Sequence, residues 1–582
     1  MTARRARPRG SALLTVVLVL LATLIVGMSA LLKWSMAGYR QALNRSRRTK
    51  MLYTAESGCQ YAMAALQVYA KAYETHPTTS DYVRIIEEFI HVASNQLPPE
   101  FRLVKYEFTE GAVYGTNSLA DSLYRGARAS VKPIYVSVGV EHIADTTIYA
   151  EVTQMIEARS FSIFEYGVFV DGDLMINSDK KMEIDGSVHA NGVLSIGTRG
   201  AQLGLHLKKA VTSASNIYAI SSPEKTGINY TDTQYKFMTD LLGQKLDSDH
   251  PYWTQLALLQ WRGRVMSWVH GMPRLTLPIP NAENDPRVLI EPPHPDDTDA
   301  IAQARYANRV AVRIMPDGDV QVYSEASAGF TTVARVGDSA VSSWIDTNKY
   351  FWNNALNAFV RPLDIHVGNF RTWALANARD AFFSNSLRAG ILYVAISNSP
   401  SFNVRLTNGS SLPNAVINGV SNGFTLATDN PVYVLGNYND TTKCPASIIS
   451  DAITVLSSDW KDSEHLSTNS PCGSAKNTSY LTSMLTGQTT NMNTFTAETW
   501  YGGIEDLPKY IENWSGTGAS GNKEIRGTIA ALWASKWERN NLVVPEAGPN
   551  RLWWYDPKFG YPPGAPRFHE FVPKEWRRSA KR

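Results

Sequence analysis

The chain has 582 residues, 44% of them hydrophobic and 19% charged, which is typical of a folded protein of several domains and excludes wholesale disorder. The formal net charge is +3, but residues 1–10 contain four arginines and no acid, so the remaining chain carries −1. A nearly neutral body gives no electrostatic reason to expect a nucleic-acid partner. The 15 Trp and 27 Tyr, with many Asn, Thr, Ser and Gly residues, favour an extracytoplasmic, β-rich surface protein.

The first predicted element is a transmembrane helix. Residues 11–32 contain neither a charge nor a proline and would span about 33 Å as a helix, enough to cross a bilayer. A cleaved secretory signal has a shorter apolar core, about 7–15 residues, so this segment is expected to be retained. Apolar residues at helical spacing, and no proline between Pro8 and Pro77, predict that the helix continues through residues 33–76. Basic residues flank both ends of the span, so the positive-inside rule does not orient it.

The start of this helix resembles the class III leader of type IV prepilins. Arg9, Gly10 and Ser11 precede an uninterrupted apolar run, and the segment AESGCQYAMAAL follows about 45 residues later. Over residues 1 to about 70 the chain resembles the PilX-like minor pilins. The resemblance implies a leader of residues 1–10, which prepilin peptidase removes on the cytoplasmic face by cutting between Gly10 and Ser11. It also implies that the retained helix contacts inner-membrane lipid and other pilin-like subunits.

One position departs from the pattern of the main filament subunits. Most major pilins carry a glutamate at the fifth mature position, where this chain has Thr15. In that family the carboxylate neutralises the terminal amine of a neighbouring subunit. Its absence argues against a major pilin and agrees with a minor or tip component, such as the tip pseudopilin of a type II secretion system. An ordinary signal-anchor helix stays open as the alternative.

Residues 77–160 predict a helix followed by an antiparallel β-meander. An amphipathic helix is expected over 78–98, ending before Pro98-Pro99. Three segments then alternate apolar and polar residues with high β-branched content, which predicts strands at 101–108, 132–141 and 146–157.

Residues 161–385 predict the start of a β-solenoid-like body with helical insertions. Between 167 and 197 short apolar triplets alternate with Asp-Gly and Asn-Gly turns, a texture that suits solenoid coils or a tight meander. Helices are expected at 234–244 and 254–269, and a strand followed by a helix at 362–383. The acidic, proline-rich stretch 278–300 predicts a surface connection.

Residues 386–582 predict a C-terminal β-rich domain with a basic tail. The segment from about 391 to 514 resembles a C-terminal domain found on many PilX-like bacterial surface proteins. A helix is expected at 501–516, a buried strand in GTIAALWASKW, and a charged tail in KEWRRSAKR. The predicted fold class is therefore mainly β with α: a long N-terminal transmembrane helix, a β-meander and a β-solenoid-like body with inserted helices.

The three cysteines permit one disulfide in the C-terminal region. Cys444 and Cys472 lie 28 positions apart in a loop-rich stretch, whereas Cys59 lies far away on the predicted helix. Pairing would stabilise the region by roughly 3–4 kcal/mol and would require an oxidising compartment. Two unpaired thiols remain the alternative.

The body contains two oxygen-rich groups that could bind calcium, although both lack the spacing of known calcium motifs. They are Asp171, Asp173 and Asp185, and then Asp429, Asn430, Asn437, Asn439 and Asp440. Turn formation explains both groups without an ion, so no metal is expected. A carbohydrate-active β-helix enzyme would need clustered acids, and the available ones are Asp451, Asp459 and Glu505.

Other chemistry has little support in the sequence. His189, His294 and His366 lack metal-ligand spacing, and the chain has no nucleotide-binding, hydrolase or zinc motif, so no cofactor is expected. Aromatic residues near the C-terminus could stack on a sugar or a partner, but packing against the body is favoured: Trp553, Trp554, Tyr555, Phe559 and Tyr561.

The sequence therefore predicts a non-enzymatic, pilin-like surface protein, a minor pilin or pseudopilin of a type IV pilus or type II secretion filament. It would be a single-pass inner-membrane protein with its body outside, and would reach the cell surface after assembly. Two alternatives remain: a standalone membrane-anchored adhesin or envelope scaffold, and the carbohydrate-active enzyme. A surface glycan or protein ligand of the body is not identified by the sequence.

Overall fold

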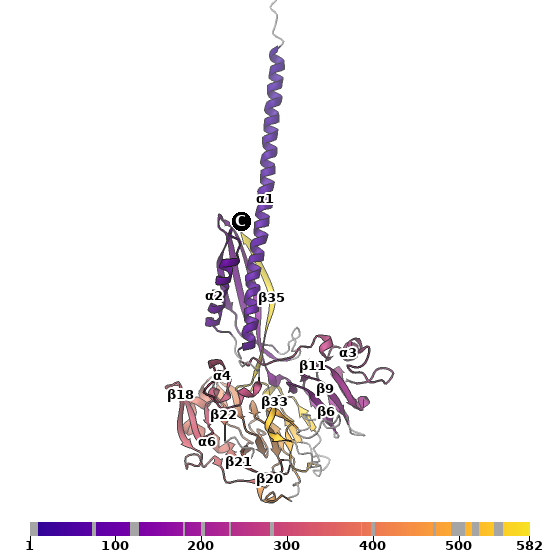
Figure 1. The fold of residues 1–582 in the computed structure, drawn as a ribbon, viewed down its shortest axis with the longest axis vertical. Helices are drawn as coiled ribbons and strands as arrows, with labels where there is room; N and C mark the ends of the chain where they lie inside the picture. Colours follow the sequence, from indigo (N-terminus) through magenta and orange to yellow (C-terminus); the bar gives the residue numbers. More distant parts are fainter. Residues whose placement is uncertain are drawn as a thin grey trace, which may run out of the picture.

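The computed structural model describes residues 10–72, 77–116, 127–178, 181–198, 204–231, 234–279, 285–354, 356–385, 387–396, 402–468, 473–490, 507–514, 523–539 and 551–581. It is β-rich, with several open sheets and one long N-terminal helix that stands out from a broad body (Figure 1). A small sheet beside the lower half of this helix connects the two parts.

Helix α1 runs without interruption from Gly10 to Ala72, which confirms the predicted long helix and gives it a length of about 95 Å. Its first half is exposed from residue 12 to residue 43. In its second half one stripe is buried, with members three or four positions apart: Met51, Ala55, Cys59, Ala62, Leu66 and Tyr69. This spacing places the stripe on one face of the helix, and that face packs against the first sheet.

The first sheet is antiparallel and has the strand order β1-β3-β4-β35. Its strands are β1 Phe101–Glu110, β3 Ala129–His142, β4 Asp145–Ser162 and β35 Arg567–Lys581, and the short β2 Tyr114–Thr116 pairs with β3. Helix α2 (Thr79–Gln96) packs beside it through Tyr82, whose ring stacks on Phe108 at 4.9 Å. The predicted helix and meander of residues 77–160 are thus confirmed as secondary structure.

The residues predicted as a basic tail lie largely in β35, which pairs along β4. The positive charges are stabilised by acids at the sheet: Arg578 contacts Glu56 at 2.7 Å and Lys574 contacts Glu157 at 3.7 Å. Phe568 and Phe571 are buried. The C-terminus therefore lies beside the middle of α1 (Figure 1).

The body is inserted between β4 and β35, and its first half is a stack of parallel strands. Three short strands recur, with equivalent positions 20 to 23 residues apart, each paired with its counterpart in the next copy. The first set is β5 Val168–Val170, β8 Val188–Ala190 and β11 Val211–Ser213; the second is β6 Leu174–Ser178, β9 Leu194–Thr198 and β12 Ile217–Ser221; the third is β7 Met182–Asp185, β10 Leu205–Leu207 and β13 Thr226–Thr231.

The close approach of these copies needs glycine at the turns. A Cβ on Gly186 would lie 2.5 Å from the Cα of Gly167 in the preceding turn. Only residues without a side chain permit that contact, because real Cβ atoms do not come so near another backbone. The outer end of the stack is covered by β14 Gln234–Phe237, α3 Trp253–Trp261 and β15 Val265–Met266.

The second half of the body stacks in the opposite direction and ends against the first strand. Its main sheet contains β16 Val312–Ile314, β22 Ile391–Val394, β25 Val420–Thr428, β27 Ala446–Ile449, β30 Ser483–Thr490 and β33 Ile529–Arg539. Strand β33 pairs in parallel with β5, so two stacks extend outward from the point where the chain enters and leaves the body. At that point the amide of Ile163 donates to the carbonyl of Pro566 at 3.0 Å.

The remaining strands of the second half complete two further sheets. One contains β19 Ile345–Asp346, β20 Phe351–Asn353, β21 Ala358–His366, β23 Phe402–Thr407, β26 Val432–Leu435, β28 Ile453–Leu456 and β31 Lys509–Tyr510. The other joins β29 Ser479–Leu481, β32 Lys523–Arg526 and β34 Arg551–Trp554 to β7. Outside these lie β17 Asp319–Ser324, β18 Gly329–Arg335, β24 Ala415–Ile417, α4 Asp299–Ala304, α5 Tyr306–Arg309 and α6 Val367–Asn377. The domain boundary predicted near residue 385 lies between β16 and β22, and these two strands pair with each other.

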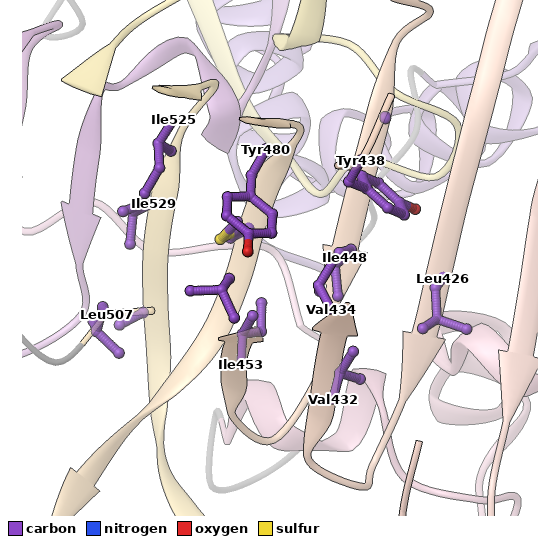
Figure 2. Packing of buried hydrophobic residues seen from close by; sticks show 14 of the residues in the cluster. Leu426, Val432, Val434, Tyr438, Ile448, Ile453, Tyr480, Leu507, Ile525 and Ile529 are labelled. Atoms are coloured by element: carbon purple, nitrogen blue, oxygen red, sulfur yellow. The ribbon is translucent and has the colours of Figure 1, made fainter. Parts of the chain in front are cut away.

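The core lies between the sheets, where apolar side chains of successive strands meet (Figure 2). Val432, Val434, Ile448 and Ile453 come from three neighbouring strands and are all at most 2% exposed. Tyr480 reaches into the same layer and donates its hydroxyl to the carbonyl of Leu456 at 2.7 Å, so its polar atom is satisfied inside the core.

Four local predictions differ from the structure. Residues 234–244 form β14 and a turn rather than a helix, because their backbone pairs with β13. The described part of the helix expected at 501–516, residues 507–514, contains β31 instead. The helix expected at 254–269 ends at Trp261, where Arg262 adopts a left-handed conformation. The stretch expected as a surface connection buries Val288, Leu289 and Ile290.

Candidate functional site

The first candidate site is the exposed half of α1, which is long and apolar enough to cross a membrane. Its most apolar window has a mean hydropathy of 2.6, and none of that window is covered by the rest of the chain. Leucines such as Leu13 and Leu24 are 74% and 64% exposed. Exposed apolar surface of this extent is costly in water, so the segment belongs in lipid or against other apolar helices.

The residues predicted for leader processing and assembly lie at the start of this helix. Gly10 is the first residue of α1, Ser11 follows it in the helix, and Thr15 is one turn further on at an exposed position. The predicted leader up to residue 9 lies outside the described residues. From residue 12 to residue 32 the helix carries no charge that could oppose burial in lipid.

Aromatic and basic residues follow the apolar segment directly. No role was predicted for the aromatic ones from the sequence. Trp34 is 79% exposed and Tyr39 is 70% exposed. Both lie among basic residues, Lys33, Arg40 and Arg45. Exposed Trp and Tyr beside cations are typical of the membrane–water interface, and their positions two and seven residues after Leu32 were the signal in the sequence.

The second half of α1 is fixed rigidly to the first sheet. A Cβ on Gly58 would lie 2.9 Å from Val138 Cγ1, so the helix and β3 are in close contact there. Cys59 is fully buried between them, and burial raises the pKa of its thiol to about 12, which leaves it unreactive. Because α1 has no break, its exposed apolar half, called the stem below, is continuous with the half that packs on the first sheet.

The second candidate site is a row of polar side chains at one corner of the body. Asp171 follows β5, Asn191 follows β8, and Asp451 follows β27. A strap formed by residues 272–279 and 285–291 covers this corner. Leu275 donates its amide to Asn191 and accepts from the Asn191 side chain, at 2.8 and 2.7 Å.

Two arginines of the strap pair with this row. Arg274 contacts Asp171 at 2.8 Å, and Arg287 donates to Asp451. Asp451 is fully buried and also accepts from the Ser535 hydroxyl at 2.5 Å and from the amide of Lys536 at 2.8 Å. Neither arginine was predicted from the sequence. Arg287 lies in the stretch 278–300 that was expected at the surface, and the triplet Val288-Leu289-Ile290 next to it was the available signal of burial.

The first group proposed for calcium forms turns and ion pairs. Asp171 is engaged by Arg274 and by Asn191, and Asp173 accepts from the amide of Val193 at 2.7 Å. Asp185 ends β7, and its carbonyl accepts from the amide of Tyr555. Within the described part of the chain, no group of three or more His, Cys, Asp or Glu side chains is arranged to hold a metal ion.

The second oxygen-rich group is likewise divided among separate turns. Asn430 accepts from the amide of Ile396 at 3.0 Å, and Asn437 accepts from the amide of Ser479 at 2.9 Å. Asn439 has a positive φ of 61° and holds the turn before Cys444 by bonding its amide and carbonyl. Asp440 has a buried oxygen in the neighbouring turn. These residues act as turn formers.

The acids considered for catalysis have separate roles. Asp451 is committed to Arg287 and to backbone amides, and Asp459 pairs with Lys476 at 2.7 Å on the surface. Glu505 lies outside the described residues.

The three histidines considered as metal ligands each have their own, separate polar partners. His189 is fully buried between Thr212 and Asn191, at 2.8 and 3.0 Å, and burial lowers its pKa to about 4. His366 accepts from the amide of Asn369 at the start of α6, and His294 lies near the exposed Asp296.

The proposed disulfide involves one described residue. Cys444 is buried, and burial raises the pKa of its thiol to about 12. Its partner in the prediction, Cys472, lies outside the described residues.

The C-terminal aromatic residues pack against the body, as expected. Trp553 and Phe559 are 4% and 1% exposed, and Trp554 and Tyr555 are partly buried. Tyr561 donates its hydroxyl to the carbonyl of Arg128 at 2.6 Å.

Asp429 makes the corner sensitive to pH. It is 4% exposed, its Oδ1 has no hydrogen-bond partner among the described residues, and burial raises its pKa to about 7 although Arg287 and Lys536 oppose the shift. Because the folded state holds this proton more tightly than the unfolded chain, the stabilisation is present below about pH 4 and is lost as the pH rises through about 7.

We therefore expect Asp429→Asn to remove one component of the pH dependence. Between pH 4.5 and 6.5 the wild type should lose up to about 1.4 kcal/mol of unfolding free energy per pH unit relative to this variant. Urea unfolding across this range measures the difference. Parallel curves for the two proteins would contradict a raised pKa at Asp429.

Comparisons with known proteins add a distant structural neighbour. No family model matches the chain, and no curated protein matches it. Among solved structures, the chain is similar to the competence-associated pilin ComZ from Thermus thermophilus, with 11% identity over 92% of this chain and 98% of that one, at a TM-score of 0.20. The score is low, and the functional proposal therefore rests on the geometry of α1 and its sheet.

Proposed function

We propose that this chain is a membrane-anchored, pilin-like surface subunit, a minor pilin or pseudopilin of a type IV or type II secretion filament, with a mechanical rather than catalytic role. The observation that carries the proposal is the continuity of α1. An exposed apolar half, free of charge from residue 12 to 32, passes without a break into a half that packs on the first sheet. Such a helix transmits force and position directly from the membrane or filament to the body.

In this proposal Ser11–Leu32 first holds the subunit in the inner membrane, with the body outside. The same segment then inserts among the helices of other subunits, where Thr15 supplies no carboxylate for a neighbour's amine. The absence of that carboxylate favours a low-copy or tip position. The parallel strands that recur every 20 to 23 residues support a further proposal, that the body is a solenoid-like platform displayed outside the cell.

The test is the N-terminus of the mature protein. We expect mass spectrometry of the chain, produced together with a prepilin peptidase, to find a species that begins at Ser11. Gly10→Val should abolish this processing, since it replaces the residue directly before the predicted cut with a β-branched one. Gly27→Val is the matched control, because a Cβ at Gly27 would meet nothing within 4 Å and the position is remote from the cut.

Two results would overturn the proposal. An intact N-terminus in the presence of active peptidase would instead favour a standalone anchored scaffold. A cut after Leu32 would show that the apolar segment is an export signal and not a stem.

A further inference from the structure

The outer end of the second stack carries two arginines that lie on aromatic rings. The guanidinium carbon of Arg313 is 3.6 Å from the ring centroid of Phe330, and that of Arg388 is 3.7 Å from the ring centroid of Tyr323. The rings belong to β17 and β18. Stacking at these distances fixes the planes of both guanidinium groups before any ligand arrives.

The charges of these arginines are not balanced by a carboxylate. Arg388 donates through Nη1 to the carbonyls of Asn308 and Val310, and Arg313 donates to Ala307, Asn308 and Gln321. In the described part of the chain, neither arginine forms an ion pair with an acid. Burial lowers the pKa of Arg313 to about 10, and the nearby charge of Arg388 adds to this effect.

The buried arginines of the body, by contrast, each form an ion pair with an acid. Arg305 pairs with Asp297 at 2.6 Å, and Arg405 pairs with Asp364 at 2.7 Å. Arg287 has Asp451. Arg313 and Arg388 are only partly buried, but a partly desolvated cation without a paired acid still marks a place where an anion would be stabilised.

A hollow of about 350 Å³ opens beside Arg388. Its lining comprises Asp299, Ala302, Gln303, Asn308, Arg309 and Arg388. The volume has room for a ligand of about one or two sugar rings. Arg309 adds a second positive charge, and the exposed Asp299 is a single opposing carboxylate in the lining.

We propose that this hollow binds an oxyanion, a carboxylate or phosphate group carried on a sugar-sized ligand, with Arg388 as the charged contact. The planar fork of a guanidinium matches two oxygens of either group. The exposed Gln303 provides an amide for a neutral oxygen of the same ligand, whereas the Asn308 amide donates to the carbonyl of Ala302 at 2.9 Å. The proposal does not depend on the role of α1, so either can fail without the other.

Calorimetry on the full-length protein in neutral detergent tests the site. The probes are digalacturonate for a carboxylate source, glucose 1-phosphate for a phosphate source, and maltose as the neutral ligand of similar size. We expect at least one charged probe to bind, more weakly as salt increases, and maltose not to bind. The preference between the charged probes then identifies the source of the oxyanion.

Variants assign the binding to Arg388. Arg388→Gln should weaken the affinity for the charged probe by roughly tenfold or more. Arg388→Lys should weaken it by less, since lysine keeps the charge but lacks the planar fork. Arg335→Gln is the control, because Arg335 lies on β18 at the same end of the body but pairs with Asp319 at 2.6 Å. Its affinity should match the wild type.

Asp299→Asn gives an independent result in the opposite direction. Asp299 is exposed, so its replacement should not disturb folding. Removing its charge should increase the affinity for the charged probe severalfold. Equal binding of maltose, no binding of either charged probe, or an Asp299→Asn variant that binds no more tightly than wild type would overturn the proposal.

Discussion

Asp451→Asn should destabilise the body by about 3–5 kcal/mol, more than a typical single substitution. The carboxylate is fully buried and joins three parts of the chain: the turn after β27, the strap through Arg287, and β33 through Ser535 and the amide of Lys536. The amide side chain keeps the shape but removes the charge. Among the described residues, the acid that still forms an ion pair with Arg287 would be the more distant Glu291, at 3.7 Å.

Urea unfolding of the full-length protein in detergent measures this loss. The matched control is Asp459→Asn, because Asp459 pairs with Lys476 at the surface, where the two side chains are 41% and 64% exposed. Its expected effect is within about 0.5 kcal/mol. The double variant Asp451→Asn with Arg287→Leu should recover part of the loss, since it removes the uncompensated cation. Equal stability of the two single variants would contradict a linking role for Asp451.

Removal of β35 should open the first sheet and release α1 from it. Truncation after Arg567 deletes Phe568, which is fully buried and lies 5.4 Å from both Phe161 and Phe169. It also leaves one edge of β4 without its partner strand and removes the contact between Arg578 and Glu56. Buried backbone groups without partners are costly, so we expect the sheet to lose its ordered packing.

Limited trypsin digestion, read by mass spectrometry, measures the exposure of α1. The truncated chain should be cut near Arg45 and Lys50 about ten times faster than the wild type, because the helix loses its cover. A shorter truncation after Arg578 is the control, since Ser579 is exposed and the deleted end contains no aromatic residue. Digestion at wild-type rate after the long truncation would show that β35 is dispensable for the stem.

The elements predicted well are those whose signal is local. The charge-free run from Ser11 to Leu32 and the absence of proline up to Pro77 require a long helix whatever the rest of the chain does. The strands of residues 101–157 have period two because one face of their sheet is buried against α1. The short triplets between Asp-Gly and Asn-Gly turns likewise indicated closely stacked strands, since the turn residues specify the backbone themselves.

The charged features were predicted less well, because their partners lie far away in the sequence. Residues 574–582 were predicted as a basic tail, yet their described part belongs to β35, which pairs with β4 about 420 positions earlier, and Arg578 contacts Glu56. The stretch 278–300 read as a surface connection, yet Arg287 meets Asp451 across 164 positions. Charge and proline content describe a segment's own solubility and cannot show which acid or sheet edge will cover it.

The sequence by itself determined that this protein has a long N-terminal helix with an apolar first part and a β-rich body, because helix length and strand period are properties of neighbouring residues. The tertiary structure alone decided that the C-terminal strand returns to the stem, that the two stacks meet where β33 pairs with β5, and that Arg388 lies beside a hollow without a carboxylate partner. Those arrangements depend on which distant groups satisfy one another's hydrogen bonds and charges, and that choice is made only when the whole chain packs.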